Sequence, residues 1–324
     1  MSPKFGKTKK DGGTTIALLD IENGSVGAAL ARLVPDYAPR LFGEIRVTIP
    51  LLNTRDTDAM TREIEKAARE ALRHVSEVAA RIRLHDILAQ TGEVERTAAF
   101  LSPPWAAMHL VGGTADYAPH MPDLVQGLIQ DAFGDKHATL HPFGTAVAHG
   151  AVALFPEMTP AMLCIVNGEV TELLVIAENT LVGRATIPMG LHSLLRTLTS
   201  HGGLSAAEAR SLLALGSRTP HAALQEPISA VQAHFAREFG DVAKALLERA
   251  PVQHVFVLAP HAAEEWFARA LAQDESLTQA FPEGSTVRAL RAQHMMPYLS
   301  AHAPKPDLPL MLEALFVDAK FSGI

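Results

Sequence analysis

The sequence predicts an α/β protein built from two lobes of matching architecture. Its 324 residues exceed the roughly 100 to 200 residues of one ordinary domain. Hydrophobic residues make up 48% of the chain and charged residues 19%, which provides enough apolar surface for a sizeable core. An apolar strand, an Asn-Gly turn and a longer return strand occur in the first half, and the same order recurs in the second half.

The charge and the cysteine content indicate which partners and which cellular compartment are compatible with the sequence. The net charge of −7 is spread along the chain, which argues against nucleic acid as the main partner. The single cysteine, Cys164, allows no internal disulfide, which suits the reducing cytoplasm. Residues 1–13 are rich in lysine but lack the apolar stretch of a secretory signal. We expect them to form a flexible basic tail.

The first half begins with a predicted three-strand meander. Thr15–Asp20 is a short apolar strand, and the Asn23-Gly24 pair that follows predicts a tight turn. Ser25–Leu33 is the return strand, and Glu44–Leu51 is a third strand because apolar and polar residues alternate in it.

A long amphipathic helix follows the meander. Apolar residues such as Met60, Ile64 and Val75 recur every three or four positions between Asp56 and about Leu88. Two short strands, a Gly-Gly pair and another helix come next, predicted at Thr97–Leu101, Ala106–Val111, Gly112-Gly113 and Met121–Ala132.

The second half repeats the meander and then becomes mainly helical. Its strands are predicted at Ala161–Val166, Val170–Ala177 and Thr180–Gly190, with the Asn167-Gly168 turn after the first of them. Ser205 and Glu208 form a capping box, and Val252–Leu258 is an apolar run typical of a buried parallel strand. Helices are predicted from Leu191, at Pro227–Arg249, at Glu264–Ala272 and at Leu308–Phe316.

Three further groups of residues were weighed as sites. His137, His141 and His149 could ligate a metal, but Pro142 interrupts the helix and no glutamate accompanies them, so we predict no metal site. Cys164 lies in an apolar strand and is expected to be an inert buried thiol. Trp105 is either a partner anchor or part of the core, and core packing is favoured.

The order of elements resembles the superfamily of actin, sugar kinases and heat-shock chaperones, whose ribonuclease H-like fold is duplicated into two lobes. A strand-helix-strand-strand module at about 44–113 makes it more similar to the cell-division protein FtsA and the pilus assembly protein PilM. The resemblance implies a first lobe at 14–160 with this inserted module, and a second lobe at 161–324. The C-terminal helix could then dock on the first lobe.

The resemblance also points to a nucleotide cleft with altered motifs. The family's first phosphate turn resembles Asp-Ile-Gly-Ser-Ser-Ser-Val, and residues 20–26 match it at four positions, with Glu22 in place of the glycine. In the second phosphate turn, Ile165 replaces a carboxylate. Ala259-Pro260-His261 replace the paired glycines of the adenosine site. The residues that remain as a residual cleft are Asp20, Gly24, Ser25, Thr171 and Gly190.

These replacements predict that nucleotide turnover is lost and that no catalytic residue remains. Glycines allow the backbone to approach phosphates, and carboxylates hold Mg²⁺. Glu22 would place a negative charge beside a phosphate. We therefore expect no resident cofactor, while ATP and Mg²⁺ stay open as ligands of a functional cleft.

The resemblance implies a non-catalytic or weakly nucleotide-binding platform that assembles a membrane machine, as PilM does for the bacterial type IV pilus. Its partner would be a cytoplasmic peptide of an inner-membrane assembly protein, held near Arg46–Leu51 and Leu101–Leu110. It would be cytoplasmic, reach the inner face of the membrane through that partner, and could form a homo-oligomer.

Two alternative functions remain open at the sequence level. One is a working ATPase or small-molecule kinase with Asp20, Ser25 and Thr171 around the phosphates. The other is an FtsA-like filament former in cell division, which is disfavoured because Phe321–Ile324 ends the sequence without an amphipathic membrane helix.

Overall fold

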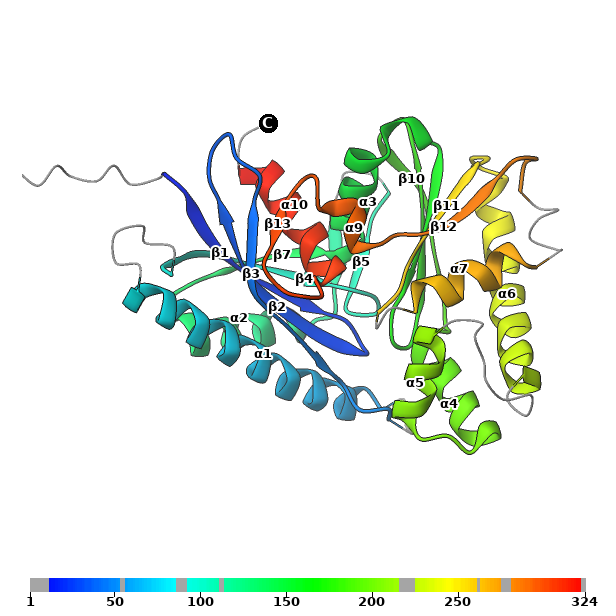
Figure 1. Ribbon diagram of the computed structural model, residues 1–324, viewed down its shortest axis with the longest axis horizontal. Helices are drawn as coiled ribbons and strands as arrows, with labels where there is room; N and C mark the ends of the chain where they lie inside the picture. The colour runs from blue at the N-terminus through cyan, green and yellow to red at the C-terminus, as the bar shows by residue number, and fades with distance from the viewer. Residues whose placement is uncertain are drawn as a thin grey trace, which may run out of the picture.

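Two sheets of the same topology form the body of the protein (Figure 1). The computed structural model describes residues 12–52, 56–85, 92–110, 114–215, 225–260, 263–274 and 281–321. The strand order is β13-β3-β2-β1-β4-β7 in the first sheet and β10-β9-β8-β11-β12 in the second. Each sheet has an antiparallel meander followed by two parallel strands. The duplicated architecture predicted from the two Asn-Gly turns is confirmed.

The first lobe contains most elements of the first half of the chain. They are β1 (Thr14–Ile21), β2 (Ser25–Leu33), β3 (Arg40–Thr48), α1 (Thr57–His85), β4 (Val94–Leu101), β5 (Ala106–Met108), β6 (Ala115–Tyr117), α2 (Met121–Phe133), β7 (Ala138–Pro142) and α3 (Phe143–Leu154).

The second half of the chain forms the second lobe and then returns to the first. After the 3₁₀ turn Pro156–Met158, its elements are β8 (Ala161–Val166), β9 (Thr171–Ala177), β10 (Thr180–Ile187), α4 (Leu191–Gly202), α5 (Ala206–Leu215), α6 (Gln225–Leu247), β11 (His254–Leu258), α7 (Glu264–Ala272), β12 (Thr286–Ala289), α9 (Ala292–Met295), β13 (Ser300–Ala301) and α10 (Leu308–Phe321). β13 pairs with β3, so the chain ends on the first lobe.

Strand alternation places one core on each side of a sheet. In β1, Ala17 and Leu19 point to the face that α1 and α2 cover, whereas Ile16 and Leu18 point to the opposite face. That second face packs on α3 and α10, which also contact the inner face of the second sheet. The helices α4 to α7 cover the outer face of the second sheet. Figure 1 shows α3 and α10 between the two sheets.

The structure corrects the prediction of a separate inserted module at 44–113. β3 pairs with β2, and β4 runs parallel to β1 in the centre of the first sheet. α1 crosses this sheet as the connection between β3 and β4. The predicted module is therefore the core of the first lobe. Among the described residues, β5 and β6 alone form a small separate sheet.

The segment 137–156 contains strand β7 and helix α3. The capping box is confirmed, because Glu208 accepts hydrogen bonds from the amide and hydroxyl of Ser205. Within the described residues, no helix combines the length and apolarity that a membrane crossing requires.

Candidate functional site between the lobes

The two hairpin turns meet at the seam between the lobes. A Cβ atom added to Gly24 would lie 2.9 Å from Gly168 Cα, and one added to Gly168 would lie 2.7 Å from Gly24 Cα. Neither glycine has φ in the left-handed region. The missing side chains therefore serve the close approach of the two backbones rather than the shape of either turn.

Side chains of the first turn accept the backbone amides of the second. The Gly168 amide donates to Glu22 Oε2 over 2.9 Å, and the Glu169 amide donates to Asn23 Oδ1 over 2.8 Å. Glu22 is only 5% exposed, and its other oxygen accepts the Ser25 hydroxyl over 2.6 Å. Turn amides of this kind are donors that anions use. The Glu22 carboxylate thus occupies an amide donor of the second turn that an external anion could otherwise use.

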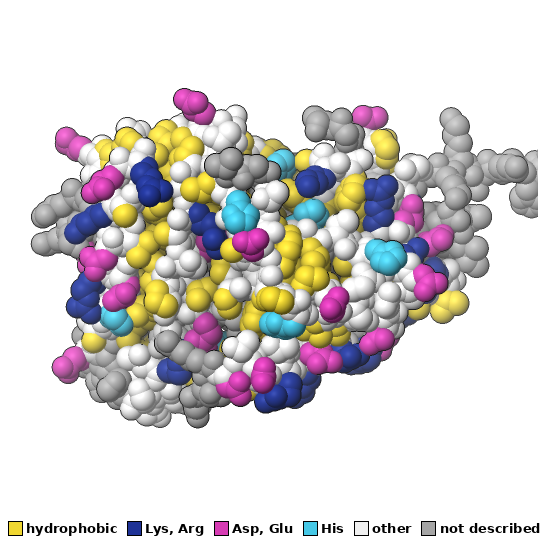
Figure 2. Space-filling model, turned by 180° about the vertical axis from the view of Figure 1, so that it is seen from behind, with side chains coloured by type: hydrophobic (Ala, Val, Ile, Leu, Met, Phe, Trp, Pro, Cys, Tyr) yellow, Lys and Arg dark blue, Asp and Glu magenta, His cyan; other side chains and the backbone are white. Residues whose placement is uncertain are grey.

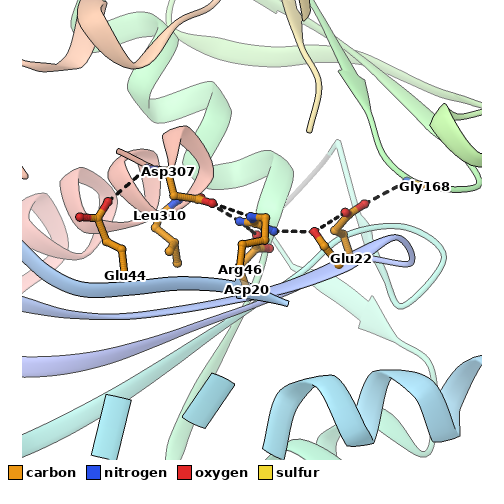
Figure 3. Close-up of polar contacts among 8 residues, drawn as sticks. Asp20, Glu22, Glu44, Arg46, Gly168, Asp307 and Leu310 are labelled. Carbon is orange, nitrogen blue, oxygen red and sulfur yellow. Dashed lines mark hydrogen bonds and ion pairs between the residues drawn. The ribbon is translucent and has the colours of Figure 1, made fainter. Parts of the chain in front are cut away.

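Arg46 joins the two ends of the chain behind this contact (Figure 3). Its guanidinium donates to Asp20 Oδ2 over 2.6 Å and to Ser25 Oγ over 2.9 Å. It also donates to both oxygens of Asp307, over 2.5 and 2.8 Å. Asp307 in turn accepts the Leu310 amide at the start of α10. One largely buried cation, 13% exposed, therefore links the first turn to the C-terminal helix.

Charges in this cluster perturb one another. Burial raises the pKa of Asp20 to about 6, against the attraction of the Arg46 guanidinium. Burial alone would lower the pKa of Arg46, but Asp307 and Asp20 hold it well above its ordinary value. Arg46 is therefore a permanent cation in this site.

Glu313 on α10 is a second buried carboxyl beside Asp20. Its side chain is fully buried, and within the described part of the chain the Asp20 carboxyl is the one group with which it shares a hydrogen bond. Burial raises the pKa of Glu313 well above its ordinary value, and the negative charge of Asp20 raises it further. Both effects favour the neutral acid form of the Glu313 side chain in the folded protein.

A second cluster fixes the turn of the second lobe. Arg196 on α4 donates to both oxygens of Glu169, over 2.8 and 2.5 Å, and to the Leu52 carbonyl beyond β3 over 3.3 Å. Burial raises the pKa of Glu169, but the hydrogen bonds from Arg196 and His192 outweigh it and lower the pKa to about 2. This cluster also crosses the seam.

Little space remains inside the seam. A cavity of about 20 Å³ is bounded by Asp20, Glu22 and Arg46 on one side and by Ile165 and Pro260 on the other. Such a volume holds about one water molecule, whereas pockets for small molecules measure about 300 to 1,000 Å³. With the lobes in this arrangement, the residues present do not fit a nucleotide or its metal ion.

The five residues predicted as a residual cleft all lie at this seam, each engaged within the protein. Asp20 and Ser25 bond to Arg46, while Gly24 touches the second turn. The Thr171 hydroxyl donates to the Met189 carbonyl over 2.8 Å. A Cβ at Gly190 would lie 2.4 Å from the Asn167 carbonyl oxygen, so this glycine permits α4 to begin against the second turn.

Sequence reasoning missed the residues that close the seam. Arg46 is one polar residue in an alternating strand, and its partner Asp307 lies 261 positions away. Nothing local connects the two. Glu313 did carry a signal, because it is a lone carboxyl in the apolar run Leu310–Val317. Such a residue in a helix predicts a buried titratable group.

The other candidate residues have structural roles. His141 lies between the rings of Phe100 and Phe316, at centroid distances of 5.3 and 5.1 Å. Burial and then Lys320 lower the pKa of His141 to about 4. In the described residues, no three His, Cys, Asp or Glu side chains are placed to hold a metal ion. Cys164 is fully buried, which raises the pKa of its thiol. Trp105 packs in the first-lobe core at 3% exposure.

Alanine at Gly168 should force the two turns apart. The added Cβ would meet the Gly24 backbone at 2.7 Å, and overpacking of this kind costs about 1 to 3 kcal/mol. Urea unfolding of Gly168→Ala measures the cost. Gly127→Ala is the matched control, because Gly127 lies in α2 with no neighbour within 4 Å and alanine favours a helix. Equal stability of the two variants would show that the turns do not press on each other.

Comparison with known proteins is informative at the level of the fold. No protein-family model and no curated protein matches the chain. The solved PilM-PilN type IV pilus biogenesis complex is similar, with a TM-score of 0.55 at 11% identity, and 94% of this chain and 95% of that chain are covered. The ethanolamine utilization protein EutJ from Carboxydothermus hydrogenoformans has a TM-score of 0.53 at 14% identity, with 85% and 84% covered.

These similarities and the repeated sheet topology define the fold of the protein. The chain has the two-lobed, ribonuclease H-like fold of the actin-like superfamily. Within that class it is similar to PilM and EutJ in fold, at identities too low to carry their functions over.

Proposed function

We propose that the protein is a non-catalytic, actin-like assembly platform that acts without nucleotide. The observation that supports this proposal is the seam closed by the protein's own side chains. Glu22 accepts the Gly168 amide, and Arg46 occupies the carboxylate of Asp20. Phosphoryl transfer needs bound phosphates, a metal ion and a positioned nucleophile. The cavity of about 20 Å³ is too small to hold these groups together.

The seam carries a second pocket that suits a peptide side chain. It measures about 170 Å³ and lies where Pro104 and Trp105 of the first lobe face Val170 and Pro188 of the second, beside the start of α1. Pro104 and Trp105 belong to the predicted groove segment Leu101–Leu110. The other predicted segment, Arg46–Leu51, lines no part of this pocket, since Arg46 is held in the seam cluster.

The partner in this proposal is a short cytoplasmic peptide of an inner-membrane assembly protein. The similar PilM structure was solved as a complex with PilN, and a mainly apolar pocket between the lobes can take an aliphatic or aromatic side chain from an extended peptide. Figure 2 shows hydrophobic side chains gathered in the middle of one face, among charges of both signs. The platform would lie in the cytoplasm and reach the membrane through this partner.

Peptide titration tests the proposal directly. The probes are labelled synthetic peptides of the cytoplasmic tails of single-span membrane proteins encoded beside this one, added with and without Mg·ATP. We expect one peptide to bind with micromolar affinity in both conditions. Pro188→Glu should weaken it by about tenfold or more, whereas Val182→Glu, at another exposed site, on β10 and outside the lining of this pocket, should not. Binding that requires Mg·ATP, or steady ATP turnover, would contradict the proposal.

A further inference from the structure

The pocket of about 170 Å³ proposed for the peptide takes its walls from both lobes. We call it the peptide pocket. Asn23 of the first turn lines it, as do Glu169 and Val170 of the second turn. The two turns touch, since the Gly168 amide donates to Glu22 and the Glu169 amide donates to Asn23. The width of the peptide pocket therefore depends on contacts that cross the seam.

Asn23 ties the two walls together. It is buried, its Oδ1 accepts the Glu169 amide over 2.8 Å, and its Nδ2 donates to the Pro103 carbonyl over 3.2 Å. Pro103 directly precedes Pro104 and Trp105, which form the first-lobe wall. Breaking either bond leaves a buried polar group without its partner, which is costly. Asn23 thus fixes the spacing between the first-lobe wall and the second turn.

The second-lobe wall is fastened to the second turn. The Leu191 amide donates to the Asn167 carbonyl over 2.9 Å. The Thr171 hydroxyl donates over 2.8 Å to the carbonyl of the residue after Pro188. These bonds join Pro188 to the turn that carries Val170. When the second turn moves away from the first, the second-lobe wall of the peptide pocket should therefore move with it.

Arg196 makes a second tie across the seam. It donates to both oxygens of Glu169, which lines the peptide pocket, and to the Leu52 carbonyl over 3.3 Å. Leu52 precedes α1, whose first turn supplies Thr57 and Met60 to the lining. Two cross-lobe ties thus hold the walls of the peptide pocket in place.

We propose that closure of the seam and occupation of the peptide pocket are coupled, with Asn23 as the positioning residue that links them. A peptide side chain seated between Trp105 and Val170 contacts both lobes, so it stabilises the arrangement in which the two turns touch. A group that separates the turns opens the pocket and releases the peptide. This inference rests on the proposed platform function and adds how its binding site is regulated.

Acrylamide quenching of tryptophan fluorescence tests the coupling without a peptide. The chain has two tryptophans, so Trp266→Phe leaves Trp105 as the one reporter. Trp105 is 3% exposed and should be quenched weakly while the seam is closed. Asn23→Ala and Glu22→Ala should each raise its quenching constant by about twofold or more, because the second-lobe wall withdraws from the indole. Glu22 contacts the second turn without belonging to the described lining, so its replacement tests the coupling itself.

Two further variants separate this coupling from a general loss of stability. Gln126→Ala is the matched control, because Gln126 also donates to one backbone carbonyl and accepts one backbone amide, beside the edge strand β7. Glu22→Gln keeps an acceptor for the Gly168 amide and should restore weak quenching. Equal quenching of Trp105 in Asn23→Ala, Glu22→Ala and Gln126→Ala would overturn the inference.

Hydrogen exchange on the unsubstituted chain gives the reciprocal measurement, which needs no variant to fold. The probes are the labelled peptides of the titration above. A saturating peptide should slow exchange of the Gly168 amide by about fivefold or more, and Asn23→Ala should weaken that peptide by about fivefold or more. Peptide binding without added protection at Gly168 would contradict the coupling and leave the platform function standing. If no peptide binds, the platform function fails, and the quenching of Trp105 still decides whether the turns control the pocket.

Discussion

Replacement of Arg46 by methionine is expected to lower the free energy of unfolding by about 3 to 5 kcal/mol at neutral pH. The variant leaves Asp20 and Asp307 near each other without their shared cation, in a site where Asp20 is 2% exposed. Few single substitutions lower the free energy of unfolding this much, and one that leaves a buried charge without its partner is among them. Urea unfolding followed by circular dichroism measures it, and hydrogen exchange should show earlier opening at the start of α10.

The matched control is Arg69→Met on the same lobe. Arg69 also contacts two carboxylates, Glu65 and Asp131, but its side chain is 52% exposed. Exposed ion pairs contribute less than about 1 kcal/mol. The loss of unfolding free energy for Arg46→Lys should lie between those for Arg46→Met and Arg69→Met, because lysine keeps the charge but not the forked geometry. A loss for Arg46→Met no larger than that for Arg69→Met would show that the cluster does not hold the seam.

Glu313→Gln is expected to stabilise the protein at alkaline pH and to change how its stability depends on pH. The folded-state pKa of Glu313 is raised by burial, so the folded protein holds a proton that the unfolded chain releases above about pH 4.3. Stability from this group is therefore full below the unfolded pKa and is lost as pH rises toward the folded pKa. The loss is about 1.4 kcal/mol per pH unit.

The comparison with wild type reports the Asp20–Glu313 pair. His141, with a pKa of about 4, titrates in both proteins, whereas Asp20, with a pKa of about 6, is coupled to Glu313, so the difference belongs to the two carboxyl groups together. The difference in unfolding free energy between Glu313→Gln and wild type should grow from pH 5 to pH 8. Glu283→Gln, on an exposed surface, should follow wild type. A constant difference across this pH range would mean that Glu313 is already ionised in the folded protein.

The duplication could be read from the sequence because its signals are local. Both Asn-Gly turns follow an apolar strand and precede a longer return strand, and these features need no knowledge of tertiary contacts. The return strand Ser25–Leu33 and the helix Glu264–Ala272 were predicted with the bounds that the structure has. The spacing of apolar residues and the turn residues were sufficient to predict the bounds of these two elements.

The arrangement of the first lobe could not be read in this way. A strand, a long amphipathic helix and a strand have the same local pattern whether they form an inserted module or the centre of a sheet. The two arrangements differ in whether β4 (Val94–Leu101) pairs with β1 near the N-terminus, as it does in the structure. Such non-local pairing leaves no period in the sequence.

The seam illustrates a second limit. Glu22, Ile165 and Pro260, the positions of the altered motifs, all line the seam cavity. The sequence could not show that Glu22 turns toward the second lobe and accepts the Gly168 amide. A glutamate at this position could either repel a phosphate or take the place of one. The two roles are distinguished only by where the partner amide of Gly168 lies.

Isothermal titration calorimetry with Mg·ATP and Mg·ADP tests the central claim most directly. Since the side chains of Glu22, Asn23 and Arg46 fill the seam, the full-length chain should release no heat beyond dilution at millimolar nucleotide and neutral pH. Micromolar affinity, with crystals of the complex showing the phosphates between the two turns and a cation on Asp20, would contradict the closed seam and the platform function proposed from it.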